Sequence, residues 1–193
     1  MSNLDTAFDT MKRRLARLLL EKSYREGSFV LTSGRKSDYY FDGKQTALHP
    51  EGAWLIGHLF NSLLAEGPDI SAVGGMTLGA DPLVSATSVI SYELGRPLAA
   101  FIVRKIPKGH GTNQYLEGLA NLQRGARVAM LEDVVTTGGS LLAACERVTE
   151  AGFSIEAVCT VLDREEGGSE AVENAGYSLR SLFKRAELLD CAK

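Results

Sequence analysis

The residues after the apolar run Val128–Leu131 combine acids, hydroxyls and glycines in an order suited to a phosphorylated sugar. Glu132 and Asp133 come first, and a turn rich in hydroxyls and glycines, Thr136–Ser140, follows two residues later. Glycines let a backbone approach a phosphate closely, and the first amides of a following helix point at the anion. The carboxylates are acceptors for the vicinal hydroxyls of a ribose. The alternative is an ordinary turn with one hydroxyl as helix N-cap, but two buried carboxylates are costly unless a cation or donor meets them.

This segment resembles the signature with which type I phosphoribosyltransferases bind phosphoribosyl pyrophosphate (PRPP). The resemblance implies that the turn holds the 5-phosphate and that the acidic pair contacts the ribose hydroxyls. It also implies that oxygens of PRPP coordinate Mg²⁺, with no direct protein side-chain ligand. The signature identifies the superfamily and not the base that is accepted. The implied PRPP-binding residues are Glu132, Asp133, Val134, Val135, Thr136, Thr137, Gly138, Gly139 and Ser140, with Asp133 also assigned to catalysis and Thr136 also to the base.

A second group of charges lies between Leu94 and Leu116, where the chain has no Asp or Glu. Arg104, Lys105, Lys108 and His110 match, at every spacing, the mobile catalytic loop of orotate phosphoribosyltransferases, which this segment resembles. All four are assigned to PRPP binding, and the last three also to catalysis. A cationic loop that closes over PRPP would neutralise the departing pyrophosphate and exclude water, and a histidine can donate a proton near neutral pH. On charge alone, a solvated basic loop is the alternative.

Two more segments resemble the orotate-binding parts of the same family. Residues 31–42 look like its N-terminal Ser-Gly-x-x-Ser segment, in which Tyr40 and Phe41 hold the aromatic positions beside orotate. Residues 162–168 resemble its Leu-Asp-Arg turn, in which Arg164 contacts orotate, and a guanidinium suits the oxo groups of an anionic pyrimidine. The alternatives are core packing for the aromatic residues and a plain surface position for the arginine.

Two places depart from many members of the family. Thr32 stands where many have Lys, and the segment 75–82 has no cation where many have a Lys. Thr136 bears on the choice of base, because some purine transferases have an Asp there to protonate the purine. Orotate can react as its N1 anion and needs no such acid. Adenine-specific relatives also lack the Asp, so a purine or uracil transferase stays the alternative enzyme.

The elements that must position these motifs follow from periodicity. Residues 4–19 have helical spacing, short strands are expected at 27–32 and 38–41, and a helix is expected over 49–66. Apolar strands at 70–75, 98–103, 128–131 and 155–162 alternate with helices at 81–94, 139–151 and 169–175. This alternation predicts an α/β fold, a parallel β-sheet core flanked by helices, with ligands beyond the carboxyl ends of the strands.

The resemblance implies the type I phosphoribosyltransferase fold as a single domain over residues 1–193. A small N-terminal hood element would consist of residues 1–48 together with the C-terminal segment. Residues 106–125 are polar and contain Pro107 and several glycines, which predicts a long mobile catalytic loop. The resemblance also implies a homodimer with shared active sites, in which the loop of one chain reaches the site of the other.

Composition limits the alternatives. The net charge is −3, which gives no reason to expect nucleic-acid binding or membrane binding. Three cysteines in no metal or disulfide pattern, and an N-terminus without a signal-like stretch, predict a cytoplasmic protein. A PRPP-sensing regulator on the same fold is the alternative from another class. It would need a basic nucleic-acid-binding face, and it would not need the cationic loop.

Overall fold

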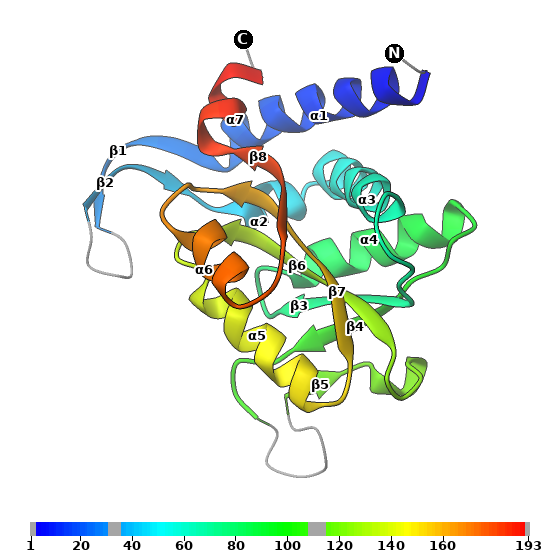
Figure 1. Cartoon of the computed structure of the whole chain (residues 1–193). Helices are drawn as coiled ribbons and strands as arrows, with labels where there is room; N and C mark the ends of the chain where they lie inside the picture. The colour runs from blue at the N-terminus through cyan, green and yellow to red at the C-terminus, as the bar shows by residue number, and fades with distance from the viewer. Residues whose placement is uncertain (1–2, 31–35, 108–114, 192–193) are drawn as a thin grey trace.

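Six strands form the central sheet in the order β5-β4-β3-β6-β7-β8 (Figure 1). The computed structural model describes residues 3–30, 36–107 and 115–191. The strands are β3 (Ala72–Met76), β4 (Ala99–Val103), β5 (Leu116–Glu117), β6 (Arg127–Val135), β7 (Ser154–Asp163) and β8 (Leu179–Lys184). Neighbouring strands are parallel except for the antiparallel pair of β4 and β5.

Successive side chains along each strand point to opposite faces of the sheet and so contribute to two separate hydrophobic cores. On β6, Ala129 and Leu131 belong to one cluster, whereas Val128 and Met130 belong to the other. The first cluster is covered by α1 (Asn3–Lys22), α3 (Pro50–Ala65) and α4 (Asp81–Glu93). The second is covered by α5 (Gly139–Glu150) and α6 (Gly168–Asn174). Strands buried on both faces explain why the sequence shows apolar runs instead of alternation.

The helices after β3 and β6 lie on opposite faces of the sheet, which makes the carboxyl ends of these two neighbours the switch point of the topology. β6 pairs with β3 only from Val128 to Met130, but it stays paired with β7 as far as Val135. The edge of β6 beyond Met130 is therefore left open toward the loop that follows β3. Open α/β sheets place their ligands in such crevices.

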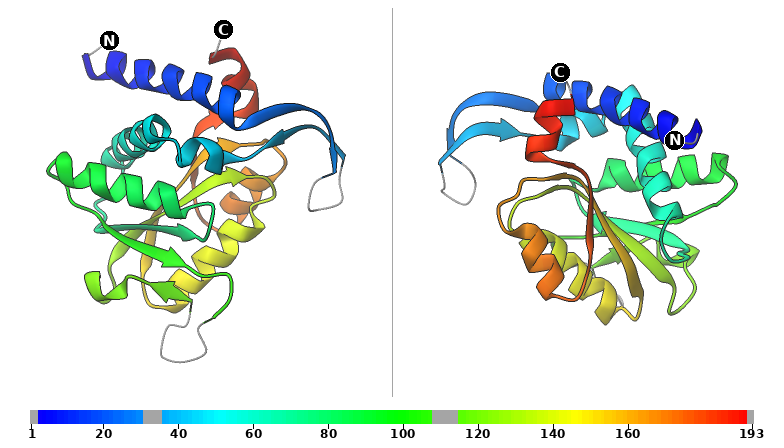
Figure 2. Two further views of the ribbon diagram at one scale, coloured as in Figure 1. Left: turned by 180° about the vertical axis from the view of Figure 1, so that it is seen from behind. Right: turned by 45° about the horizontal axis from the view of Figure 1, so that its top comes forward.

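The first and last segments of the chain lie together beyond the sheet (Figure 2). β1 (Tyr24–Val30) and β2 (Lys36–Phe41) form an antiparallel hairpin, and α7 (Arg185–Cys191) packs on α1, where Lys12 pairs with Glu187. β2 leads into α2 (Gly43–Ala47), which contacts β6. These are the segments that the sequence assigned to the hood.

The parallel sheet and its flanking helices were predicted correctly, but β6 is longer than expected. The apolar run suggested a strand that ends at Leu131, whereas the strand continues through the acidic pair to Val135. The reason is its pairing with β7, which continues to Val135 and Asp163. Glu132 and Asp133 are therefore strand residues and not the start of a loop.

The segment 106–125 also differs from a loop without regular structure. Leu116 and Glu117 form β5 against β4, and a 3₁₀ turn, η1 (Leu119–Asn121), follows. Leu116 is 5% exposed, so this part is anchored in the second core. The short elements α2, β8 and α7 were not predicted at all. Among the helices of the described ranges, none is long and apolar enough to cross a bilayer.

Candidate active site

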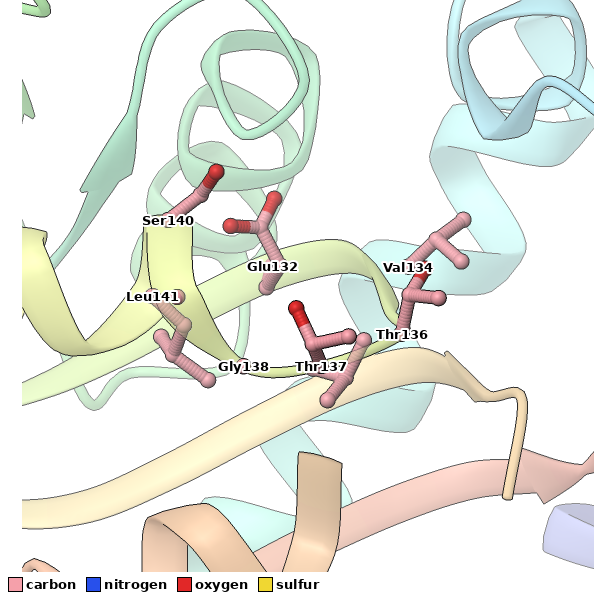
Figure 3. Close-up of a pocket in the computed structure, with 9 residues that line it drawn as sticks. Glu132, Val134, Thr136, Thr137, Gly138, Ser140 and Leu141 are labelled. Carbon is pink, nitrogen blue, oxygen red and sulfur yellow. The ribbon is translucent and has the colours of Figure 1, made fainter. Parts of the chain in front are cut away.

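The turn between β6 and α5 encloses a cavity of about 90 Å³ (Figure 3). Its lining consists of Glu132, Val134, Val135, Thr136, Thr137, Gly138, Gly139, Ser140 and Leu141, and thus includes eight of the nine residues predicted in this segment. The helix begins at an N-cap glycine, Gly138, with φ of 80° and no side-chain cap bond. The interpretation of a hydroxyl as the helix cap is therefore wrong. Because no side chain caps them, the first amides of α5 are available to an anion.

Glu132 and Asp133 point to opposite faces of β6, as neighbours on a strand do. Glu132 is 6% exposed and lines the cavity beside α5 (Figure 3). Burial, followed by the nearby Asp133 charge, raises the pKa of Glu132 well above its usual range, and Lys105 partly opposes this. Backbone amides hold both carboxylates, since Asp133 N–H donates to Glu132 Oε1 (3.1 Å) and Val134 N–H donates to Asp133 Oδ1 (2.9 Å).

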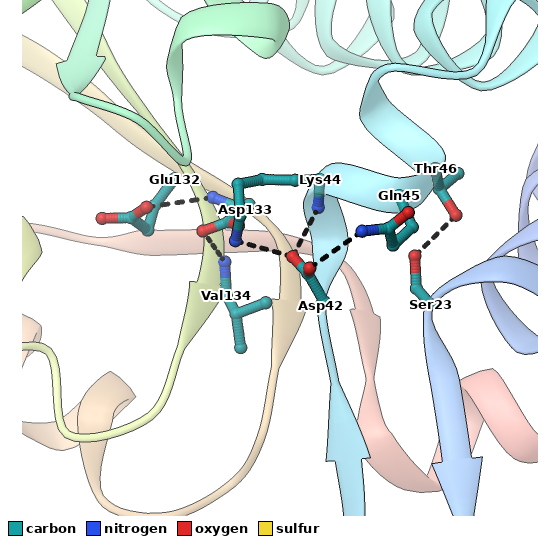
Figure 4. Close-up of polar contacts among 8 residues, drawn as sticks. All are labelled: Ser23, Asp42, Lys44, Gln45, Thr46, Glu132, Asp133 and Val134. Carbon is teal, nitrogen blue, oxygen red and sulfur yellow. Dashed lines mark hydrogen bonds and ion pairs between the residues drawn. The ribbon is translucent and has the colours of Figure 1, made fainter. Parts of the chain in front are cut away.

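Asp133 lies between two glycine backbones. A Cβ at Gly79 would come within 2.7 Å of Asp133 Oδ1, and a Cβ at Gly43 would come within 3.2 Å of Oδ2. Lys44, one residue further along α2, carries a charge that acts on Asp133, and its Nζ pairs with Asp42 Oδ1 at 2.6 Å (Figure 4). The sequence analysis missed Lys44. The cost of the two carboxylates indicated that a cation or a hydrogen-bond donor had to be near them, but nothing in the sequence said which residue supplies it.

The end of β3 and the loop that follows it lie close to β6 because the residues there are small. A Cβ at Gly75 would lie 2.3 Å from the Leu131 carbonyl oxygen, so β3 and β6 approach more closely there than a side chain permits. Thr77 Oγ1 donates to Asp81 Oδ2 (2.8 Å), and Thr77 N–H donates to the Val103 carbonyl (2.9 Å). The loop thus presents backbone and hydroxyl groups to the crevice, which fits its lack of Lys and Arg.

The cationic segment, which begins at Arg104, leaves the sheet at the end of β4, beside the crevice at the carboxyl ends of β3 and β6. Arg104 pairs with Glu117 (3.1 Å), and its amide donates to the Tyr115 carbonyl (2.7 Å), so the two ends of the segment are tied together. Lys105 is exposed and acts on the charge of Glu132. The structure thus brings Lys105 near Glu132, whereas the Arg104 side chain pairs with Glu117. The predicted residues Lys108 and His110 lie outside the described residues, as does Thr32.

The side chain of Arg147 on α5 contacts the backbone of this segment. Its Nη1 donates to the Arg104 carbonyl at 2.7 Å, its Nη2 lies 3.5 Å from the Lys105 carbonyl oxygen, and its guanidinium lies 4.2 Å from the centre of the Tyr115 ring. The sequence analysis did not identify Arg147 as a functional residue. One side chain therefore connects α5 to both ends of the cationic segment.

Arg164 lies at the carboxyl end of β7 and is only 7% exposed. It pairs with Glu166 at 2.9 Å, and its guanidinium lies 4.5 Å from the centre of the Tyr39 ring. The plain surface position considered for Arg164 is therefore wrong. Burial raises the pKa of Tyr39, while Arg164 and Arg185 act in the opposite direction.

The two aromatic residues predicted to lie beside orotate, Tyr40 and Phe41, do not contact Arg164 in the way that Tyr39 does. Phe41 is 8% exposed and belongs to the first core cluster, whereas Tyr40 is 44% exposed and packs near Phe29 on the other face of β2. Tyr39, one residue earlier, is the aromatic residue that stacks with Arg164. The role of Tyr40 and Phe41 in binding orotate stays a prediction.

The cysteines are free, and two of them are core residues. Burial raises the pKa of the thiols of Cys145 and Cys159 to about 12, which excludes them as nucleophiles near neutral pH.

Comparison with known proteins identifies the family. No protein-family model matches the chain. It is 48% identical to the orotate phosphoribosyltransferase of Nostoc sp. over 93% of this chain and 85% of that protein, and 48% identical to that of Aquifex aeolicus over 92% and 97%. A crystal structure of the Mycobacterium tuberculosis orotate phosphoribosyltransferase in complex with Fe(III) dicitrate matches with a TM-score of 0.81 and 41% identity, over 92% of this chain and 98% of that one. Another from that organism, in complex with PRPP, matches with a TM-score of 0.76 and 38% identity, over the same shares. With such identity over nearly its whole length, the chain belongs to the orotate phosphoribosyltransferase family.

Proposed function

We propose that this chain transfers ribose 5-phosphate from PRPP to orotate, giving orotidine 5′-phosphate and pyrophosphate, as a step in pyrimidine biosynthesis. The observation that carries the proposal is the meeting of three features at the switch point of the sheet. These are the uncapped start of α5, the carboxylates of Glu132 and Asp133, and the charge of Lys105. A doubly anionic sugar phosphate with free hydroxyls fits this set.

The turn Thr136–Ser140 holds the 5-phosphate through the first amides of α5 and its hydroxyls. Asp133 accepts hydrogen bonds from the ribose hydroxyls, and Glu132 assists from the other side of β6. As the bond to pyrophosphate breaks, negative charge gathers on the leaving group, and a cation placed there lowers the barrier. Lys105 supplies that cation, together with Lys108 and His110 further along the segment.

Orotate is held by Arg164, whose guanidinium binds its oxo groups, with the aromatic residues of β2 beside the ring. Arg164 is buried and stacked on Tyr39, so it is already oriented before a ligand arrives. Thr136 contacts the base side of the site. Because a threonine cannot protonate a purine ring, this position favours a base that reacts as an anion.

Mg²⁺ enters the site with PRPP. The described ranges contain no group of three or more His, Cys, Asp or Glu side chains that could hold a metal ion. We expect a Mg²⁺ in the site to take its oxygens mainly from phosphates and water. When bound, the ion neutralises part of the pyrophosphate charge.

The protein acts as a homodimer with shared active sites. Large apolar side chains are exposed on neighbouring helices, with Trp54 on α3 at 44% and Val89 and Tyr92 on α4 at 61% and 78%. Such a patch on a protein surface commonly marks an interface. The cytoplasm is its compartment, and free cysteines suit reducing conditions.

A panel of acceptors tests the function. Orotate, uracil, adenine, hypoxanthine and guanine are each supplied with PRPP and Mg²⁺, and pyrophosphate release is followed. Orotate alone should turn over well, and chelation of Mg²⁺ should stop the reaction. A purine that reacts as fast as orotate would show that the base is wrong. PRPP binding without transfer to any base would favour the sensor instead.

A further inference from the structure

A lysine on α2 lies between two carboxylates at the edge of the site (Figure 4). Lys44 Nζ is 2.6 Å from Asp42 Oδ1, and its charge also acts on Asp133. Burial lowers the pKa of Lys44, but the two carboxylates more than offset that effect and raise it above the ordinary value. The amine therefore stays protonated, while 40% of its side chain is exposed.

The backbone around Lys44 is fixed by its neighbours. Asp42 caps the start of α2, where its Oδ1 accepts from the Lys44 amide at 3.2 Å. Gly43 and Thr46 are buried, and the Thr46 hydroxyl lies 2.7 Å from the Ser23 hydroxyl at the start of the hairpin. The base of the lysine side chain thus has a defined place beside β6.

Asp133 is confined from two sides by glycine backbones. Gly43 approaches it from α2, and Gly79 approaches it from the loop after β3, so closely that a Cβ at Gly79 would collide with the carboxylate. The segment 75–82, to which Gly79 belongs, contains no Lys or Arg. On this face of β6 the charge of Lys44 acts on Asp133, whereas the charge of Lys105 acts on Glu132.

We propose that Lys44 is a positioning residue for Asp133, which it holds in place for the ribose hydroxyls of PRPP. The proposal rests on the proposed function, because it takes Asp133 as the acceptor for ribose. Each carboxylate of the acidic pair then has its own cation, one from α2 and one from the segment after β4. A carboxylate without its cation would bind a proton more readily and accept hydrogen bonds less well.

Lys44→Met and Lys44→Arg test the proposal, with Lys22→Met as the matched control. Lys22 has the same side-chain exposure, 40%, and pairs with a neighbouring carboxylate (Glu21, 2.7 Å), but it lies at the end of α1. Lys44→Met should raise the KM for PRPP and the calorimetric Kd of PRPP about tenfold, since one partly exposed charge contact is lost. Lys44→Arg should recover most of the affinity, and Lys22→Met should match the parent protein.

The split between KM and kcat separates positioning from a merely structural role. The charged and titratable groups around Lys44 are Asp42, Tyr40 and Asp133, and those around Glu132 across the strand are Lys105 and Cys145. Because Lys44 acts on Asp133 and not on the departing pyrophosphate, Lys44→Met should raise the KM for PRPP and leave kcat within about threefold of the parent value. A loss of local structure would lower kcat together with the affinity for PRPP.

Asp42→Asn supplies the opposite perturbation. Asparagine caps helices as well as aspartate, so α2 should persist, while Lys44 loses its competing carboxylate. PRPP should then bind at least as tightly as it does to the parent protein. An equal loss of PRPP affinity in both variants, or an unchanged PRPP Kd in Lys44→Met, would overturn the proposal. Binding of PRPP is measured without transfer, so a failure to use orotate would count against the proposed function and not against Lys44.

Discussion

Arg147 offers a test of how the turn Thr136–Ser140 and the cationic segment that begins at Arg104 work together. It sits on α5 and bonds to the carbonyl of Arg104, lies beside the carbonyl of Lys105 and packs on Tyr115. Arg147→Met keeps much of the apolar stem but removes the guanidinium. We expect the segment to lose its defined start, and with it the placement of Lys105 opposite Glu132.

The size of the effect follows from the contacts. A hydrogen bond from a charged donor contributes about 1.5–3 kcal/mol, and a partly exposed cation–π contact adds about 0.5–1 kcal/mol. Water can reach part of this site and replaces some of the lost interactions, so the net loss of interaction free energy is about 1.4–2.7 kcal/mol. If this loss raises the free energy of the transition state, kcat falls about tenfold to a hundredfold.

The assay is steady-state kinetics with PRPP and orotate, together with calorimetric binding of PRPP. We expect a lower kcat and a PRPP Kd that changes less than threefold, because the turn at the start of α5 is intact. Arg127→Met is the control, since Arg127 also pairs with a carboxylate (Glu156, 3.2 Å) but lies at the far end of β6. A parental kcat in Arg147→Met, or an equal fall in Arg127→Met, would refute the reasoning.

Three further predictions address the acidic pair. Burial raises the pKa of Glu132, so its contribution to stability is present below the ordinary carboxyl pKa and is lost as the pH rises through the raised value. Glu132→Gln should therefore unfold at a higher temperature than the parent at pH 8 and at a similar temperature at pH 4, and equal shifts at both pH values in calorimetry would contradict this. Gly79→Ala places a methyl group 2.7 Å from Asp133 Oδ1 and should weaken PRPP binding at least tenfold, whereas Gly67→Ala, with its nearest neighbour at 3.6 Å, should not. Inactive Lys105→Ala and Asp133→Asn chains should regain activity when their subunits exchange, because one site of each heterodimer then carries neither change; no recovery despite proven exchange would exclude shared sites.

Local patterns in the sequence predicted which residues lie together in the central part of the candidate site. The order of acids, hydroxyls and glycines at 132–140 lies on a single strand, turn and helix, so neighbours in the sequence are also neighbours in space. The same holds for the pair Arg104 and Lys105, which leave the sheet at the end of an apolar run. The alternation of strands and helices then predicted that both motifs meet at the carboxyl edge of a parallel sheet.

The aromatic residues of β2 show where such patterns fail. Tyr39, Tyr40 and Phe41 are consecutive, and a shift of one residue exchanges the two faces of a strand. The pairing of β1 with β2 is irregular between Glu26 and Phe29, so the register cannot be counted from the turn. Tyr39 faces Arg164 as a result, a contact that joins distant segments of the chain and has no local signal.

The length of β6 determines how charge is distributed in the site. β3 stops pairing with β6 at Met130, and β7 carries the strand onward to Val135, so the acidic pair extends into the open crevice as part of a rigid strand. Alternation then sends Glu132 toward α5 and Lys105, and sends Asp133 toward α2 and Lys44. Two adjacent residues thus connect two cations from opposite faces of the sheet. The strand places the two side chains on different sides of β6, so that Lys44 acts on Asp133 and Lys105 acts on Glu132, while the Asp133 charge still raises the pKa of Glu132.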